Sequence, residues 1–203
     1  IGEDGPSQMA LEDLAMMRAV HGSTVLYPSD GNQTAKLVAA MADRDGVVYM
    51  RTTRANTPIL YGADEQFPIG GSRVVRGGGS DDRVTVVGAG ITLHEAVMAA
   101  DTLAKDGIRI RVIDLYSLKP IDSKTLATAV AATGGRLVVA EDHWPEGGIG
   151  DAVLASLAGA GVSGVTFRHL APREMPGSGK PAELLHAAGI DATSIVKAVR
   201  GLI

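Results

Sequence analysis

The chain has 203 residues, of which 45% are hydrophobic and 21% are charged, and its formal net charge is −4. This composition is typical of a globular protein, and the length is enough for one large domain or two small ones. The acidic balance argues against a nucleic-acid partner, and no apolar run approaches the roughly 18 residues that a membrane span needs. Cysteine is absent, which excludes disulfides and fits a reducing compartment.

Helix and strand signals alternate in the first third of the chain, as is typical of a parallel sheet. Apolar residues at helical spacing mark the helices, and short β-rich runs that end at proline or glycine mark the strands. In chain order, the predicted elements are a helix over 7–20, a strand over 23–28, a helix that Asp30 caps and that ends near Arg44, and a strand over 47–54.

A glycine-rich stretch follows, and we place a domain boundary before it, near residue 67. The alternation then resumes to the end of the chain. The sequence therefore predicts an α/β fold, with parallel or mostly parallel sheets covered by helices on both faces, in two units over 1–66 and 67–203. Beyond the boundary, strands are predicted over 73–76, 83–88, 108–116, 136–143 and 164–171, and helices over 92–107, 123–135, 148–161, 181–189 and 191–203.

A G-x-G turn in VVGAGITLHEA lies between a predicted strand and a predicted helix, as in dinucleotide-binding sites. Asp114, about 20 residues further on, would suit a ribose contact in such a site. The third glycine position holds Leu93, however, which argues against a dinucleotide. The simpler interpretation is a tight turn between a strand and a helix.

Three ionisable residues, Glu141, Asp142 and His143, lie at the end of a predicted strand and before a glycine-rich helix start. Ligands of open α/β sheets bind at such strand ends, and a helix start of this kind could bind an anion. The same residues could instead cap helices and form a contact between subunits, with Trp144 at its centre. We favour this structural interpretation, and no second histidine at ligand spacing supports a metal site.

Two arginines, Arg51 and Arg54, end the predicted strand over 47–54. Arg54 is followed by loop residues, so its planar guanidinium would be free to bind a phosphate or carboxylate; a surface salt bridge is an equally good interpretation. Near the start of the chain, Asp4 precedes Gly5 and Pro6. It could cap the first helix, which the residues alone favour, or accept hydrogen bonds from the hydroxyls of a sugar-like substrate.

Seven segments, in this order along the whole chain, resemble the C-terminal third of transketolases, in particular their animal-like branch. The two most specific are GEDGPSQMALEDLAMMR at 2–18, which replaces a histidine-containing loop of other transketolases, and SGKPAELLHAAGID at 178–191. The others are YPSDGNQTAK, YMRTTR, VTVVGAGITLHEA, IRVIDLYSLKPID and VAEDHWPEGGIGDAV.

This resemblance implies a transferase that uses thiamine diphosphate and Mg²⁺ to move a two-carbon ketol unit from a ketose phosphate to an aldose phosphate, in the pentose phosphate pathway. It also implies a cytoplasmic homodimer whose active sites form between subunits. By position, Asp4 would accept hydrogen bonds from substrate hydroxyls, Gln8 would lie near the cofactor and the substrate, and Arg54 would bind the sugar phosphate. Glu3 and Ser7 would shape the loop.

Other parts of the implied site have no counterpart in this sequence. The metal and diphosphate ligands and the glutamate that activates the cofactor would lie upstream, so no catalytic residue is assigned here. The chain opens with Ile1 rather than Met, and we expect this residue to be the edge of a fragment or of an ordered piece. Residues 1–66 would then be the second half of a pyrimidine-binding domain, and 67–203 would be a transketolase C-terminal domain.

Two further functions stay open. The chain could be a fragment or subunit that serves assembly or binding without catalysis, since the cofactor and metal residues are missing. It could also be the β subunit of a thiamine-dependent 2-oxo acid dehydrogenase, which has a similar C-terminal domain, although the GEDGPSQ loop argues against that. In each case we expect the isolated chain to be inactive as a transketolase.

Overall fold

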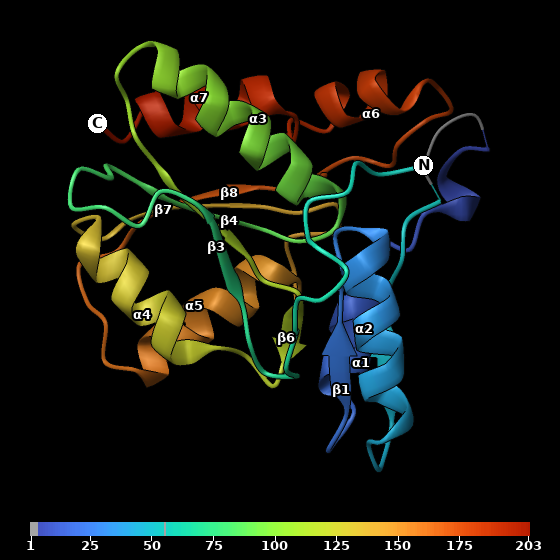
Figure 1. The fold of residues 1–203 in the computed structure, drawn as a ribbon. Helices are drawn as coiled ribbons and strands as arrows, with labels where there is room; N and C mark the ends of the chain where they lie inside the picture. Colours follow the sequence, from blue (N-terminus) through green and yellow to red (C-terminus); the bar gives the residue numbers. More distant parts are fainter. Residues whose placement is uncertain (1–3, 55) are drawn as a thin grey trace.

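The computed structural model describes residues 4–54 and 56–203, and helices alternate with strands along most of this length (Figure 1). The strands are β1 (Thr24–Leu26), β2 (Val48–Met50), β3 (Arg73–Arg76), β4 (Thr85–Gly88), β5 (Arg111–Asp114), β6 (Ser117–Lys119), β7 (Arg136–Ala140) and β8 (Thr166–Leu170). The helices are the 3-10 helix η1 (Pro6–Gln8), α1 (Asp13–Ala19), α2 (Gly31–Ala42), α3 (Ile91–Lys105), α4 (Ser123–Ala132), α5 (Ile149–Gly159), α6 (Pro181–Ala187) and α7 (Ala192–Arg200).

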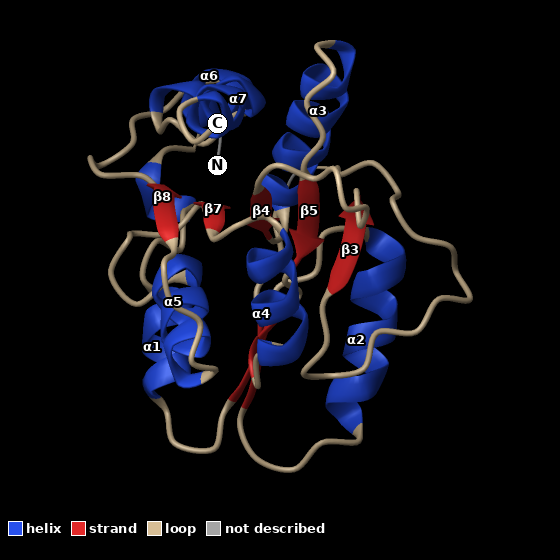
Figure 2. Ribbon diagram, turned by 90° about the vertical axis from the view of Figure 1, so that its left-hand side faces the viewer, coloured by secondary structure: helices blue, strands red, loops and turns tan. Residues whose placement is uncertain are grey.

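The larger sheet of the described residues has five strands in the order β3-β5-β4-β7-β8. Strands β5, β4, β7 and β8 run parallel, and β3 pairs antiparallel with β5 at one edge. Helices α3 and α7 cover one face, and α4 and α5 cover the other (Figures 1 and 2). The central strands are continuous apolar runs because both of their faces are buried, which confirms the predicted α/β class.

The smaller sheet, within the same described residues, has the order β2-β1-β6. Strand β1 is parallel to β2 and antiparallel to β6. Neighbouring residues of β1 point to opposite faces, so that Val25 packs in one core cluster with Leu14 of α1, and Leu26 packs in another with Leu37 of α2. Asp30 caps α2 as predicted, because its carboxylate accepts a hydrogen bond from the amide of Gln33 at 2.7 Å.

Strand β6 joins the two sheets and was not predicted as a separate element. Only two residues separate it from β5, so the chain passes directly from the larger sheet into the smaller one. Leu118 of β6 is buried in the same core cluster as Val25 of β1 and Ile113 of β5. The two sheets are therefore held together by backbone pairing and by a shared hydrophobic core.

The prediction of one continuous helix over 7–20 is wrong. η1 ends at Gln8, α1 begins at Asp13, and the residues between them are not helical. The carbonyl of Ala10 accepts a hydrogen bond from the Arg51 side chain at 2.7 Å, and that of Leu11 accepts one from the amide of Trp144 at 3.0 Å. These two carbonyl groups therefore accept hydrogen bonds from residues far away in the sequence. In a continuous helix they would accept hydrogen bonds from amides of the helix itself.

None of the helices in the described part of the chain combines the length and the apolar character needed to cross a membrane.

Candidate functional site

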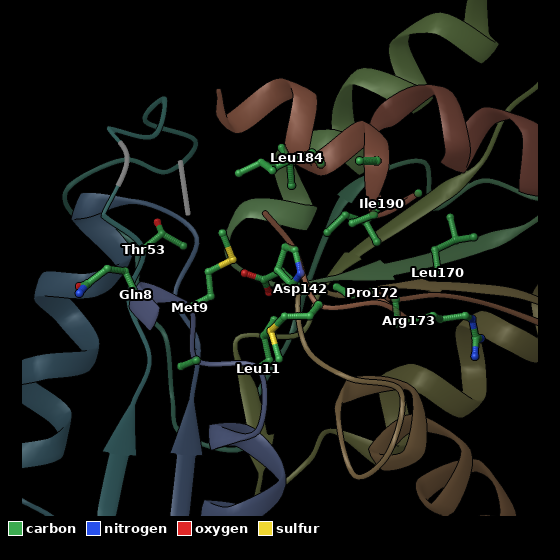
Figure 3. A pocket seen from close by; sticks show the side chains of 18 of the residues that line it. Gln8, Met9, Leu11, Thr53, Asp142, Leu170, Pro172, Arg173, Leu184 and Ile190 are labelled. Carbon is green, nitrogen blue, oxygen red and sulfur yellow. The ribbon is translucent and has the colours of Figure 1, made fainter. Parts of the chain in front are cut away.

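A cavity of about 810 Å³ lies where the chain leaves the carboxyl ends of β2, β7 and β8, beside α6 (Figure 3). Ligands of α/β proteins bind at this end of the strands. Figure 3 shows Gln8 and Thr53 on one side of the cavity, Leu184 and Ile190 on another, and Asp142 between them. Most of the lining comes from four segments, residues 8–11, 49–54, 169–177 and 184–190.

Asp4 and Arg54 form an ion pair beside this cavity, which Arg54 also lines. Both side chains are exposed, Arg54 at 73% and Asp4 at 43% of their surface. The N-cap position of η1 is held by Gly5, and within the part of the chain that the structure describes no side chain caps this helix, so the interpretation of Asp4 as a helix cap is wrong. Two residues that the resemblance assigns to substrate therefore lie together in space.

Gln8 is the last residue of η1, and its exposed side chain borders the cavity next to Met9. The turn that presents it is closed by hydrogen bonds from the amides of Gln8 and Met9 to the carbonyls of Gly5 and Pro6. Ser7 is an exposed residue of the same turn, and Glu3 lies outside the described residues.

Arg51 also lines the cavity but, unlike Arg54, its side chain is buried. Its Nη2 donates to the carbonyls of Ala10 and Asp142 at 2.7 and 2.9 Å. Its Nη1 lies 3.4 Å from the carboxylate of Asp142, its Nε lies 3.6 Å from that of Asp13, and its guanidinium lies 4.9 Å from the ring centre of Tyr27. Burial lowers the pKa of Arg51, but the neighbouring carboxylates raise it, and the net direction is upward.

Two tyrosines complete this group. Tyr27 donates its hydroxyl hydrogen to Asp142 at 2.9 Å, and Tyr49 donates to Asp13 at 2.6 Å. Burial, together with the hydrogen bond to Asp13, raises the pKa of Tyr49 to about 12, so the phenol stays a donor at neutral pH. We call the five residues Asp13, Tyr27, Tyr49, Arg51 and Asp142 the junction cluster.

Glu141 and His143 are buried beside Asp142 and have protein partners. The Glu141 carboxylate accepts hydrogen bonds from the amides of Ile149 and Gly150 at 2.5 and 2.9 Å, and lies 2.5 Å from Nε2 of His169. Glu141 therefore caps the start of α5, as the structural interpretation predicted.

His143 links the loop after β7 to α1. Its Nδ1 lies 2.6 Å from the carbonyl of Trp144, and its Nε2 lies 3.3 Å from the amide of Ala15. The amide can only donate, so Nε2 is the acceptor and Nδ1 carries the hydrogen. Trp144 in turn donates from its indole to Glu12 at 2.9 Å. The predicted contact of these residues with another subunit stays a prediction.

The G-x-G turn and Asp114 are also occupied by the protein itself. Gly90 has a φ of +53°, and a Cβ added there would overlap the ring of Tyr27. The Asp114 carboxylate accepts hydrogen bonds from Ser29, Gln33 and Tyr61 at 2.7–3.0 Å. Neither feature offers the free groups that a dinucleotide would need.

No group of three or more potential ligands within the described residues could hold a metal ion. The junction cluster was missed from sequence, apart from Arg51 and Asp142 as separate candidates. Its members lie up to 129 positions apart, from Asp13 to Asp142, so no spacing pattern marks them.

Comparison with known proteins agrees with this architecture. Residues 73–195 match the family model for the transketolase C-terminal domain, and residues 1–59 match the model for the transketolase pyrimidine binding domain. Curated transketolases of Mus musculus and Homo sapiens are each 53% identical over all 203 residues of the chain. A solved structure described as "Split gene transketolase, inactive beta4 tetramer" aligns with a TM-score of 0.87 and 34% identity, over 97% of this chain and 62% of that one.

The fold and these matches define an α/β chain of the class that combines transketolase pyrimidine-binding and C-terminal domains. The chain belongs to the transketolase family, which confirms the resemblance seen in its sequence. It spans 32% of the length of the two curated transketolases.

Proposed function

We propose that this chain is the C-terminal part of a transketolase that transfers a two-carbon ketol unit from a ketose phosphate to an aldose phosphate. The observation that carries the proposal is the pairing of Arg54 with Asp4 beside a cavity that Gln8 also borders, in a chain of the transketolase family. We further propose that residues 1–66 are the second half of a pyrimidine-binding domain and 67–203 the C-terminal domain. The matched ranges 1–59 and 73–195 support this division.

In this proposal Arg54 binds the phosphate of the sugar. Its present partner is an exposed carboxylate, and exposed ion pairs of this kind contribute only about 0–1 kcal/mol. A phosphate dianion offers more charge and a geometry that the guanidinium can bind with two hydrogen bonds, so it can replace Asp4. Asp4 is then free to accept hydrogen bonds from substrate hydroxyls.

The residues near Gln8 suit one part of thiamine diphosphate. The Gln8 amide offers donors and an acceptor, and the cavity wall beside it carries Met9 and Leu11, so this surface suits a flat and weakly polar heterocycle. When bound, the cofactor supplies the covalent chemistry of ketol transfer. This chain's own residues bind and orient the substrate. Mg²⁺ and the diphosphate would be held by residues outside this sequence.

The proposal is tested by assaying the complete enzyme with a ketose phosphate and an aldose phosphate, and separately with 2-oxo acids. We expect turnover of the sugar phosphates alone, which excludes the dehydrogenase β subunit. Oxidation of a 2-oxo acid, or no turnover of sugar phosphates by a correctly folded complete enzyme, would contradict the proposal. The intact mass of the active species shows how much chain it needs.

A second candidate concerns the isolated chain. The structural neighbour is described as an inactive β4 tetramer of a split gene transketolase, and this favours an assembly without catalysis for the chain alone. Titration of the isolated chain with thiamine diphosphate and Mg²⁺ should then give no heat. Tight binding would rule this candidate out. We also propose a cytoplasmic homodimer as the working form of the complete enzyme.

A further inference from the structure

The junction cluster connects four segments of the chain. Asp13 begins α1, Tyr27 follows β1, Arg51 directly follows β2, and Asp142 lies in the loop after β7 in the C-terminal unit. The side chains of Arg51 and Asp142 are each more than nine-tenths buried. Among the described residues, Nη1 of Arg51 and Oδ1 of Asp142 have no hydrogen-bond partner, so their mutual attraction at 3.4 Å helps to offset the removal of these two atoms from water.

Arg54 depends on this cluster for its place. The backbone of Arg51 is fixed by a hydrogen bond from its amide to the carbonyl of Leu26 at 2.9 Å, and its side chain is fixed by Asp142. Arg54 follows three residues later and is exposed. The next strong backbone attachment described is at Leu60, whose amide donates to Asp30. Arg51 is therefore the fixed point from which the loop carrying Arg54 departs.

The segment that follows Gln8 is also held by Arg51 and by the loop after β7. Two residues after Gln8, the carbonyl of Ala10 accepts a hydrogen bond from Arg51. At Leu11, the carbonyl accepts one from the amide of Trp144, which belongs to the loop after β7. Both candidate site residues thus lie within three positions of a contact that involves either Arg51 or that loop.

We propose that Asp142 and Arg51 are positioning residues, through which the C-terminal unit sets the place of Arg54 and Gln8 and so controls recognition of the substrate phosphate. This inference rests on the proposed function. Both residues also line the cavity, but their side chains are more than nine-tenths buried and are paired with each other, so we assign them a positioning role rather than a catalytic one. The C-terminal unit, which contributes neither Gln8 nor Arg54, thereby takes part in substrate selection.

The variant Asp142→Asn in the complete enzyme tests the proposal, because it keeps the shape of the side chain and removes its charge. Each variant is assayed with an aldose phosphate and with the same aldose lacking the phosphate. We expect Asp142→Asn to raise KM for the phosphorylated aldose by about tenfold, the weakening of roughly one charge-assisted hydrogen bond. KM for the unphosphorylated aldose should rise less, because that substrate has no phosphate for Arg54 to bind, so the ratio of the two KM values should increase.

Asp82→Asn is the matched control. Asp82 is also buried, lies 3.1 Å from the guanidinium of Arg111, and has a carboxylate oxygen with no hydrogen-bond partner among the residues that the structure describes. It is not part of the cavity lining. Asp82→Asn should lower the stability of the enzyme about as much as Asp142→Asn does. It should leave the ratio of KM for the phosphorylated aldose to KM for the unphosphorylated aldose unchanged. An equal change of that ratio in both variants would overturn the proposal.

A double-mutant cycle shows whether Asp142 acts through Arg54. If it does, Asp142→Asn added to Arg54→Ala should raise KM for the phosphorylated aldose no further. Independent, multiplying effects would overturn the proposal. Tyr27→Phe, which removes only the hydroxyl donor to Asp142, gives a milder version of the same test should Asp142→Asn fail to fold.

Hydrogen exchange separates this inference from the proposed function. Peptides covering residues 51–54 should exchange faster in Asp142→Asn than in the parent. Their exchange rate in Asp82→Asn should equal that of the parent. If the complete enzyme has no activity on sugar phosphates but this difference is seen, the proposed function fails and the positional control stands. If the enzyme is active and exchange of 51–54 is unchanged, the positioning role is wrong.

Discussion

The exposed guanidinium of Arg54 has a partner that a ligand can replace, and this makes its role measurable. Arg54→Ala in the complete enzyme should raise KM for phosphorylated sugars by an amount equivalent to about 1.5–3 kcal/mol, the contribution of one hydrogen bond to a charged group. Steady-state kinetics with ketose and aldose phosphates check this. Arg54→Lys keeps the charge but loses the planar fork, and should fall between parent and Ala. An unchanged KM for Arg54→Ala would remove this residue from the site.

Asp114 makes stability depend on pH. Burial raises its pKa to about 6, although Tyr61, Gln33 and Ser29 donate hydrogen bonds that oppose this rise. In the unfolded chain an aspartate has a pKa of about 3.9. The folded state therefore holds the proton more tightly between these two values, and stability from this group falls as the pH rises from 4 to 6.

Asp114→Asn should abolish that loss. An amide at this position can still accept from Tyr61 and Gln33, and it cannot ionise. The free energy of unfolding of the variant, minus that of the parent, should rise by about 2 kcal/mol between pH 4 and pH 6. Urea denaturation at several pH values in this range measures the difference. A constant difference would mean that Asp114 ionises normally in the folded protein.

At the scale of elements, the turn between β4 and α3 is fixed by one close contact. Gly90 adopts φ +53° and ψ −126°, a conformation that side chains oppose, and the ring of Tyr27 fills the space where a Cβ would lie. Gly90→Ala should lower the free energy of unfolding by more than about 2 kcal/mol, because backbone strain and overpacking add.

Gly107, just after α3, provides the control for Gly90. It also has a positive φ, of +72°, but a Cβ added there would meet nothing within 4 Å. Gly107→Ala should therefore cost only the backbone strain, about 1–2 kcal/mol. Chemical denaturation of both variants gives the comparison. Equal losses would show that the Tyr27 ring yields to the added methyl group.

Most elements could be predicted from the sequence because their signals are local. The cap of α2 by Asp30 and the apolar runs of β4 and β7 each depend on a few neighbouring residues. The break after Gln8 and strand β6 could not be predicted, since each is produced by partners far away in the chain. Arg51 and Trp144 interrupt the first helix, and β1 recruits residues 117–119.

The candidate site divides in the same way. Asp4, Gln8 and Arg54 could be proposed because they lie in short segments that resemble a known family. The contacts of these residues could not be predicted. The residues alone favoured Asp4 as a helix cap, whereas in the structure it pairs with Arg54, 50 positions away. The contact between Arg51 and Asp142 spans 91 positions and carries no spacing signal.

At the scale of the whole molecule, the two sheets are not independent bodies. Strand β6 carries the chain from the larger sheet into the smaller one, and the cluster that contains Leu14 of α1 also contains Ile149 of α5. Lys119 of β6 donates hydrogen bonds to the carbonyls of Arg18 and Val20 at 2.8 and 2.7 Å. These bonds form a second connection between β6 and the end of α1.

We therefore expect the covalent connection between β2 and β3 to be dispensable, because the short link from β5 to β6 still joins the two sheets. The turn at Ala63 and Asp64 is exposed, so the chain can be divided there without cutting an element. Residues 1–63 and 64–203, produced as two polypeptides and mixed, should reconstitute one particle of the parent's size and helix content, seen by size-exclusion chromatography and circular dichroism. Separate elution of the two pieces would contradict this. Fragment complementation would then offer a way to exchange either half of the candidate site between family members.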